Sequence, residues 1–253
     1  TFFIIPDIYF ITPISGQVSL TSVTIMGRGY YSNNMVRIDF GTHQTITTDT
    51  ASANGTFSKT FAVSTQKAGT TDITAYQYEA THKGTTNNFI IKGRIYLLSP
   101  ANGVITDLVT IEGCGYGSST IVGIGFGTTQ TIATATGNSN GTFSITFYVN
   151  TQTSGSQTIT ATAPVYQGEI STTVFAINGR ITLLTPETGY VGSYVTIEGR
   201  GYSGAVTIHF GTHLSITTTT APNGTFSTSF MISTQAYGSR TITATDGYAS
   251  DKT

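Results

Sequence analysis

One stretch of sequence occurs three times in this chain of 253 residues. Val-Thr-Ile-x-Gly-x-Gly-Tyr begins at Val23, at Val109 and at Val195, so both steps are 86 residues (109 − 23 and 195 − 109). A leading proline, Phe-Gly-Thr and Asn-Gly-Thr-Phe-Ser recur around it in the same order. A fixed period of this size indicates tandem structural units, and each unit is long enough to bury its own core. We therefore expect three domains in series.

Short runs of alternating apolar and polar residues fill each unit, and turn residues separate them. In the first unit they cover residues 35–40, 45–48, 56–63 and 72–75. Threonine makes up about a fifth of the chain, whereas Leu, Glu, Lys and Arg are scarce, which is typical of strands and turns rather than helices. The sequence predicts an all-β fold of three tandem immunoglobulin-like β-sandwich domains, with about seven strands each.

The predicted domains cover residues 9–95, 96–181 and 182–253, and they follow a separate N-terminal strand at 1–8. No spacer rich in Ser, Gly or Pro divides one unit from the next. Because such joints are short, we expect the domains to form a semi-rigid rod rather than a flexible string.

An Asn-Gly pair lies between two alternating runs in every unit, at Asn54, Asn140 and Asn223. Asn-Gly between strands is typical of a two-residue type I′ hairpin, so the sequence predicts a hairpin at each of these positions. Each asparagine also begins an Asn-Gly-Thr sequon, which makes all three candidates for N-glycosylation in a secreted protein.

The repeated segments also resemble a known family. A proline and a glycine, then Val-Thr-Ile-x-Gly-x-Gly-Tyr, then a strand that ends in Phe-Gly are similar to IPT/TIG immunoglobulin-like domains. In the first unit the similarity includes Pro13, Gly16, residues 23–30 and residues 38–41, and it covers all three units. The resemblance implies an early-set immunoglobulin sandwich and, as in microbial members, a secreted or surface protein built as a tandem array. It implies no catalytic or binding residues.

The two ends of the chain differ from the internal unit boundaries. Residues 1–8 repeat the strand that closes the first and second units, whereas the third unit reaches Thr253 before such a strand. Phe2, Ile4 and Ile8 correspond to Phe89, Ile91 and Ile95 and to Phe175, Ile177 and Ile181. Because alternate residues of a strand share a face, these side chains should form its buried face, with Phe3 and Ile5 on the outer one.

We expect this strand, with Phe2, Phe3, Ile4, Ile5 and Ile8 as contact residues, to complete the third unit of another subunit by β-strand addition. Contact between opposite ends propagates, so the product would be a head-to-tail homopolymer. The alternative is a piece of a longer tandem array in which the strand continues in sequence. Since the chain has no initiator methionine and no signal peptide, we expect it to be mature, excised or partial.

The charge content argues against two classes of partner. Eleven basic and twelve acidic residues give a net charge of −1, without the clustered Lys and Arg that nucleic acids and anionic membranes require. No run approaches the ~18 apolar residues of a transmembrane helix. A surface rich in Thr, Ser, Asn and Gly with few charges is common in secreted β-repeat proteins, so we expect an extracellular, cell-surface location.

No residue pattern predicts catalysis, a cofactor or a metal site. The Gly-x-Gly segments lack a following helix, so they indicate turns rather than phosphate loops. His43 and His213 share a repeat position, but no second ligand lies at metal spacing. Glu112 and Glu198 have no counterpart in the first unit, and Cys114 has neither a disulfide partner nor a nearby histidine. We expect a non-enzymatic protein.

The sequence therefore predicts a structural subunit of an extracellular filament or pilus-like fibre. One alternative is a segment of a long surface stalk or adhesin. Another is a carbohydrate-binding accessory module, although the chain has no tryptophan to stack on sugar rings.

Overall fold

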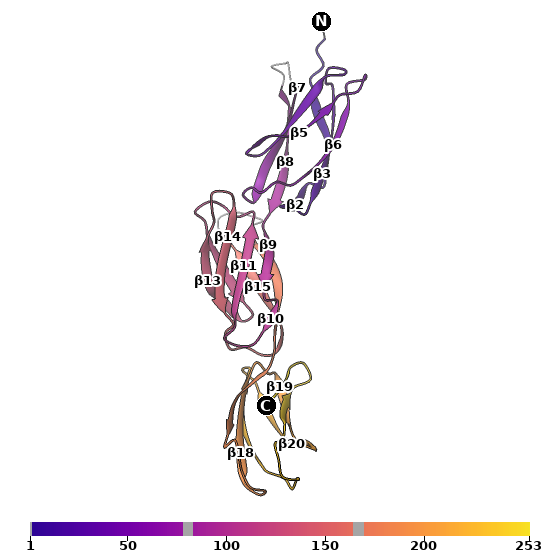
Figure 1. The fold of residues 1–253 in the computed structure, drawn as a ribbon. Coiled ribbons are helices and arrows are strands. Elements are labelled where there is room, and N and C mark those ends of the chain that lie inside the picture. The colour runs from indigo at the N-terminus through magenta and orange to yellow at the C-terminus, as the bar shows by residue number, and fades with distance from the viewer. Residues whose placement is uncertain (1, 78–82, 164–169) are drawn as a thin grey trace.

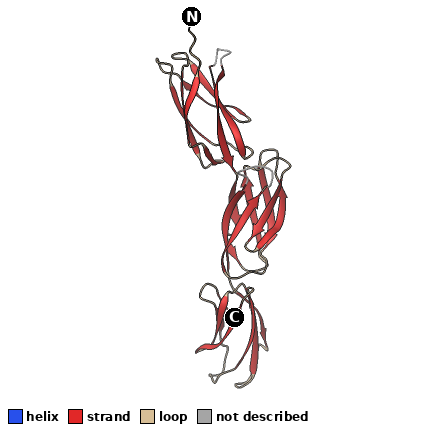
Figure 2. Ribbon diagram, turned by 180° about the vertical axis from the view of Figure 1, so that it is seen from behind, coloured by secondary structure: helices blue, strands red, loops and turns tan. Residues whose placement is uncertain are grey.

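The computed structural model describes residues 2–77, 83–163 and 170–253. Three β-sandwiches lie one after another in an elongated molecule, with the N-terminal segment projecting from the first (Figure 1). The described residues contain strands and turns but no helix (Figure 2). The predicted all-β fold of three tandem immunoglobulin-like domains is confirmed. Among these residues no helix is long and apolar enough to span a membrane.

The first domain consists of a three-stranded sheet, β1-β3-β6, packed against a five-stranded sheet, β2-β8-β7-β4-β5. Its strands are β1 (Asp7–Thr12), β2 (Ser15–Gln17), β3 (Ser22–Arg28), β4 (Met35–Phe40), β5 (His43–Thr50), β6 (Phe57–Ala62), β7 (Gly69–Gln77) and β8 (Lys83–Lys92). Strand β8 closes the domain between β7, its antiparallel neighbour, and β2, its parallel neighbour.

The second domain repeats this arrangement with sheets β9-β11-β14 and β10-β16-β15-β12-β13. Its strands are β9 (Arg94–Ser99), β10 (Asn102–Gly103), β11 (Leu108–Cys114), β12 (Ile121–Phe126), β13 (Thr129–Thr136), β14 (Thr142–Tyr148), β15 (Gly155–Thr162) and β16 (Ile170–Ile177). Here β16 takes the closing position, paired with β15 over eight residues and with β10.

The third domain has sheets β17-β18-β21 and β20-β19-β22-β23. Its strands are β17 (Arg180–Thr185), β18 (Tyr194–Arg200), β19 (Gly204–Phe210), β20 (His213–Ala221), β21 (Thr225–Met231), β22 (Ile242–Thr245) and β23 (Ser250–Lys252). Its second sheet has four strands where the other domains have five, and its last two strands are short.

The repeated motif residues form the cores. In Val23-Thr24-Ile25 the two apolar side chains are buried, because alternate residues of β3 face the opposite sheet. The motif tyrosine packs edge-on against the phenylalanine of Asn-Gly-Thr-Phe-Ser in each domain. These pairs are Tyr30–Phe57, Tyr116–Phe143 and Tyr202–Phe226. The same contact in three places explains why both motifs recur in step.

The predicted hairpins at the Asn-Gly pairs are wrong. Strands β5 and β6 on either side of Asn54 belong to different sheets, so the turn carries the chain from one sheet to the other. Only Gly55 of the pair has a positive φ, of 76°, whereas a type I′ turn needs two such residues. The true two-residue hairpin joins Phe40 to His43 through the Gly-Thr of the Phe-Gly-Thr motif.

The first sandwich begins with β1 at Asp7, and a single glycine, Gly93, separates β8 from β9. Ile8 lies in β1, paired with Gly27, and is buried in the core of the first domain. The N-terminal segment outside the first sandwich is therefore residues 2–6.

Candidate functional site

In each domain a glutamine side chain joins two loops by hydrogen bonds. One is the loop that follows β6, β14 or β21, called here the E–F loop, and the other is the Phe-Gly-Thr hairpin. In the first domain Gln66 Nε2 donates to Phe40 O at 3.0 Å, and Gln66 Oε1 accepts from Thr42 N at 2.7 Å. Gln152 and Gln235 make the corresponding bonds in the other domains. In the first and second domains these loops contact the following domain, so the clamp fixes the contact surface there.

The joint between the first two domains is built on the first of these loops. Ala68 N donates to Gly115 O of the second domain at 2.8 Å, and Ala68 is buried. A Cβ on Gly141, in the Asn-Gly turn of the second domain, would lie 3.3 Å from the Gln66 carbonyl oxygen. The turn and the loop are thus in close contact, and this contact requires glycine.

Cys114 also belongs to this joint. It lies in β11 of the second domain, but its side chain is 5% exposed and packs in the core cluster of the first. Burial raises the pKa of the thiol, while the Arg94 guanidinium opposes this shift. The equivalent residues Arg28 and Arg200 are exposed. Cys114 is therefore an interdomain packing residue.

The joint between the second and third domains uses a carboxylate. Asp246 Oδ2 accepts from Ser154 Oγ of the second domain at 2.6 Å and from Ser203 N at 2.5 Å. Its Oδ1 accepts from the backbone N–H groups of Tyr248 and Ala249. Burial alone would raise the pKa of Asp246, but the four hydrogen bonds outweigh it and lower the pKa below its ordinary value of 3.8.

In the third domain the short β23 pairs with β22, and Thr253 exchanges two backbone hydrogen bonds with Ile242, but no described strand lies beside residues 238–241. In the second domain residues 155–158 pair with residues 174–177 of β16, but the corresponding residues 238–241 lie outside any strand. On the other side of the gap, Thr188 and Gly189 take the places of β10 and are exposed. Residues 238–241 and the Thr188-Gly189 segment thus both lack the neighbouring strand that β16 supplies in the second domain.

The core under this edge is less covered than in the other domains. Phe40 packs against Phe89 of β8 with centroids 5.5 Å apart, and Phe126 packs against Phe175 of β16 at 5.8 Å. Among the described residues, the equivalent Phe210 makes a ring contact with Phe230 alone. Phe210 is 9% exposed, whereas Phe40 and Phe126 are at most 1% exposed.

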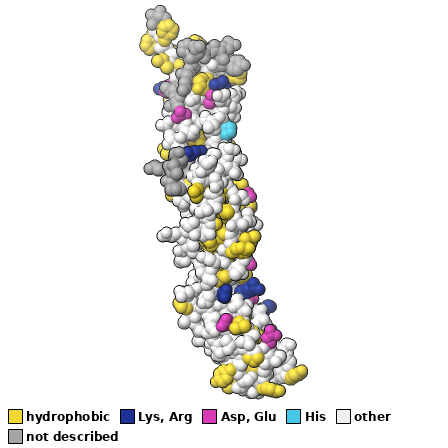
Figure 3. Space-filling view, turned by 90° about the vertical axis from the view of Figure 1, so that its left-hand side faces the viewer, with side chains coloured by type: hydrophobic (Ala, Val, Ile, Leu, Met, Phe, Trp, Pro, Cys, Tyr) yellow, Lys and Arg dark blue, Asp and Glu magenta, His cyan; other side chains and the backbone are white. Residues whose placement is uncertain are grey.

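At the opposite end of the molecule an apolar segment is exposed. Phe2, Phe3, Ile4 and Ile5 are between 73% and 92% exposed, and they project from the first domain (Figure 3). Four consecutive large apolar residues in solvent are unusual for a soluble domain. Hydrophobic side chains also gather at the far end of the third domain (Figure 3), where Tyr190, Val191, Leu214 and Tyr237 are exposed.

The exposed segment has the position of a closing strand. A Cβ on Gly29 would lie 3.1 Å from Ile4 Cγ2, and a Cβ on Gly201 would lie 3.1 Å from Ile177 Cγ2. Ile177 is the last residue of β16, which closes the second domain just before the third. The N-terminal segment therefore approaches the first domain as the closing strand of a preceding domain would.

The other candidate residues are exposed side chains at or near the ends of the domains. Asn54, Asn140 and Asn223 are exposed at their turns. His43 and His213 are exposed beside the E–F loops, where His43 Nδ1 lies 3.1 Å from Ser64 Oγ. Among the described residues no three His, Cys, Asp or Glu side chains form a group that could hold a metal ion.

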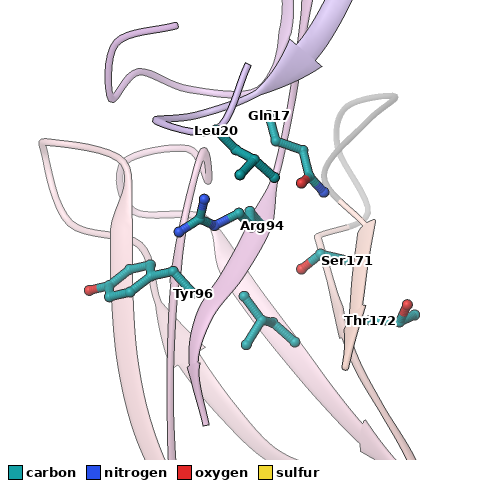
Figure 4. A pocket seen from close by; sticks show the side chains of 7 residues that line it. Gln17, Leu20, Arg94, Tyr96, Ser171 and Thr172 are labelled. Carbon is teal, nitrogen blue, oxygen red and sulfur yellow. The ribbon is translucent and has the colours of Figure 1, made fainter. Parts of the chain in front are cut away.

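A shallow hollow of about 410 Å³ lies at the first joint (Figure 4). It is lined by Gln17, Leu20, Arg94, Ile95, Tyr96, Ser171 and Thr172. The Arg94 side chain extends toward the first domain, and its Nη1 donates to Val18 O at 3.5 Å (Figure 4). This long contact helps to join the two domains across the hollow.

No family model matches the chain, and no curated protein matches it. Among solved structures, a protein crystallised with a xylogluco-oligosaccharide is 15% identical over 98% of this chain and 59% of its own, with a TM-score of 0.33. The D0-D1 domain of intimin is 14% identical over 68% of this chain and 100% of its own, at 0.27. Invasin, a bacterial integrin-binding protein, is 15% identical over 93% and 55%, at 0.29. The chain thus spans less than two thirds of the first and third of these proteins.

Proposed function

We propose that this protein is a non-enzymatic structural module of an extracellular, cell-surface filament of the IPT/TIG type, and that its copies join head to tail by strand addition. The observation that carries the proposal is the match between an exposed apolar segment and a partly covered sheet. Residues 2–5 project in solvent from one end of the molecule, and in the third domain no described strand lies beside residues 238–241, next to the less covered Phe210. The occupant of this edge is the segment of a second copy.

The internal domains define the register of this contact. In the second domain Gln157 pairs with Phe175, and Gly155 pairs with Ile177. The same alignment places Phe2 of a second copy opposite Arg240 and its Ile4 opposite Gly238. Phe2 would then supply the ring that Phe210 lacks, while the Thr188-Gly189 segment would pair on the other side.

Burial of the two core-facing side chains supplies the main expected gain. Phe2 and Ile4 would be buried, and each contributes about 1.5–3 kcal/mol when it leaves water. Backbone hydrogen bonds to both flanking segments would add to this gain and fix the direction of the strand. Because donor and acceptor lie at opposite ends, every added copy presents a new acceptor, and the assembly grows as a fibre.

The test uses the complete 253-residue chain in two matched double variants. Phe2→Ser/Ile4→Ser removes the two core-facing side chains, and Phe3→Ser/Ile5→Ser removes the two outer ones. Electron microscopy and analytical ultracentrifugation should show fibres for the parent chain and the outer-face variant, and monomers for the core-face variant.

Two results would contradict the proposal. If the parent chain remains a 26.7 kDa monomer at high concentration, the position beside residues 238–241 is not filled by a second copy, as in a piece of a longer array. If both double variants still form fibres, the contact does not use the alternation of this strand.

A further inference from the structure

The two internal joints share a surface in addition to the closing strand. At the first joint the E–F loop contacts the second domain through Ala68 and Gln66, at Gly115 and at the turn of Gly141. At the second joint a Cβ on Gly224 would clash with the Gln152 carbonyl oxygen, so the same loop and the same turn meet again.

Residues equivalent to both halves of this surface are exposed in the third and the first domain. In the third domain the E–F loop is held by Gln235, but Tyr237 is fully exposed where the equivalent Ala68 is 3% exposed. Val191 of the third domain is 57% exposed, whereas its counterpart Val18 in the first domain is fully buried. Val18 lies at the first joint, where a Cβ on Gly115 would be 3.4 Å from its Cγ2.

The facing side of the first domain shows the same difference. Gly29 is half-buried, whereas its counterparts Gly115 and Gly201 at the internal joints are buried. Its neighbour Tyr31 is 56% exposed, whereas the corresponding Gly117 is buried. Each uncovered position thus has a covered counterpart inside the molecule.

The side chains at one pair of positions are complementary in size. At the first joint the long side chain of Lys67 lies over a glycine, since a Cβ on Gly117 would be 3.2 Å from Lys67 Cε. In the third domain the residue equivalent to Lys67 is Ala236, which is small. In the first domain the residue equivalent to Gly117 is Tyr31, which is large. A large residue on one side is therefore combined with a small one on the other in both cases.

We propose that the E–F loop of the third domain docks on the first domain of a second copy, with Ala236 against that copy's Tyr31 and Val191 near its Gly29. This inference rests on the proposed head-to-tail assembly and names a second interface within it. The subunits would then be joined by a packed surface in addition to the strand, as the internal domains are.

The test is a size change with a second-site rescue in the complete chain. Ala236→Trp places a large side chain against Tyr31, and it should weaken assembly by about tenfold or more, because overpacking a close interface is unfavourable. Tyr31→Ser, which introduces the residue found at the equivalent Ser203, should restore assembly when it is combined with Ala236→Trp. Sedimentation velocity over a concentration series measures both effects.

A peptide with the sequence of residues 1–8 separates this inference from the proposed function. Its acceptor is the Phe2→Ser/Ile4→Ser chain, with and without Ala236→Trp. Equal peptide binding, weaker assembly of the Ala236→Trp chain and rescue by Tyr31→Ser are expected. If Ala236→Trp leaves assembly unchanged, or if Tyr31→Ser fails to rescue it, the docking inference is wrong while strand addition stands. If the peptide binds neither acceptor, the proposed function itself fails.

Discussion

Phe210 packs against Phe230 with their ring centroids 5.4 Å apart, but no described residue gives it the second ring contact that Phe126 makes with Phe175. Phe210 is also more exposed than Phe126. The third domain thus has the phenylalanine that a closing strand covers in the second domain, with less of that cover. Under the proposed assembly, the stability of this domain depends on the strand that a second copy supplies.

The backbone amides of the third domain should be the least protected from hydrogen exchange. Amides of residues 239–241 should exchange with solvent at least about tenfold faster than those of the equivalent residues 156–158 in β15, because only the latter are paired with a closing strand. Hydrogen exchange followed by mass spectrometry on the Phe2→Ser/Ile4→Ser chain measures this difference. Adding the peptide of residues 1–8 should slow exchange at residues 239–241 and leave residues 156–158 unchanged. Equal rates in the two segments without peptide would show that the missing strand does not weaken the domain.

The glutamine clamp should matter most where a following domain covers it. Gln152→Leu leaves Phe126 O and Thr128 N without their partner, and each unpaired buried group costs about 1–3 kcal/mol. We expect the second domain to lose about 2–4 kcal/mol of unfolding free energy in chemical denaturation. The matched variant Gln235→Leu should lower the unfolding free energy of the third domain by less, because water can reach the half-buried Gln235 and its partners. Equal losses would show that coverage by the next domain is irrelevant.

Much of the fold could be predicted because the repeated residues act locally. Val23 and Ile25 alternate with a polar residue, so the pattern predicts a strand with one buried face, which the structure contains. The sequence predicts that the chain turns at Asn54, but it does not indicate which sheet the next strand joins. That choice depends on contacts distant in sequence, such as Tyr30 against Phe57.

The surfaces between domains were less predictable. Gln66 recurs with its unit, but its bond to Thr42 spans 24 residues and appears only in the folded domain. The sequence indicates no role for Cys114, because arginine occupies its position in the other units. Its burial follows from the neighbouring domain. The sequence does not show whether Ile8 belongs to a closing strand or to the opening strand of the next unit. At the equivalent boundary between β8 and β9, a single glycine separates the two strands.

Replacing Cys114 should loosen the first joint without unfolding the domains. Cys114→Arg introduces the residue of the other two units, but a guanidinium cannot enter the apolar core cluster of the first domain without an uncompensated desolvation cost. Small-angle X-ray scattering should show a broader distribution of distances between the first and second domains. The matched Cys114→Ser variant should keep the narrow distribution. An unchanged profile for Cys114→Arg would mean that the joint does not depend on this side chain.

Asp246 should make the third domain sensitive to acid. Its folded-state pKa lies below the ordinary value of 3.8 because four hydrogen bonds favour the carboxylate despite its partial burial. A group with a depressed folded pKa contributes stability that is fully present above its unfolded pKa and is lost as the pH falls through its folded pKa. The melting temperature of the third domain should therefore fall below about pH 4. Differential scanning calorimetry between pH 7 and pH 2.5 checks this, with Asp246→Asn as the comparison. The variant should be less stable at pH 7, and its difference from the parent chain should shrink as the pH falls. A constant difference across this range would show that ionised Asp246 does not hold the joint to Ser154.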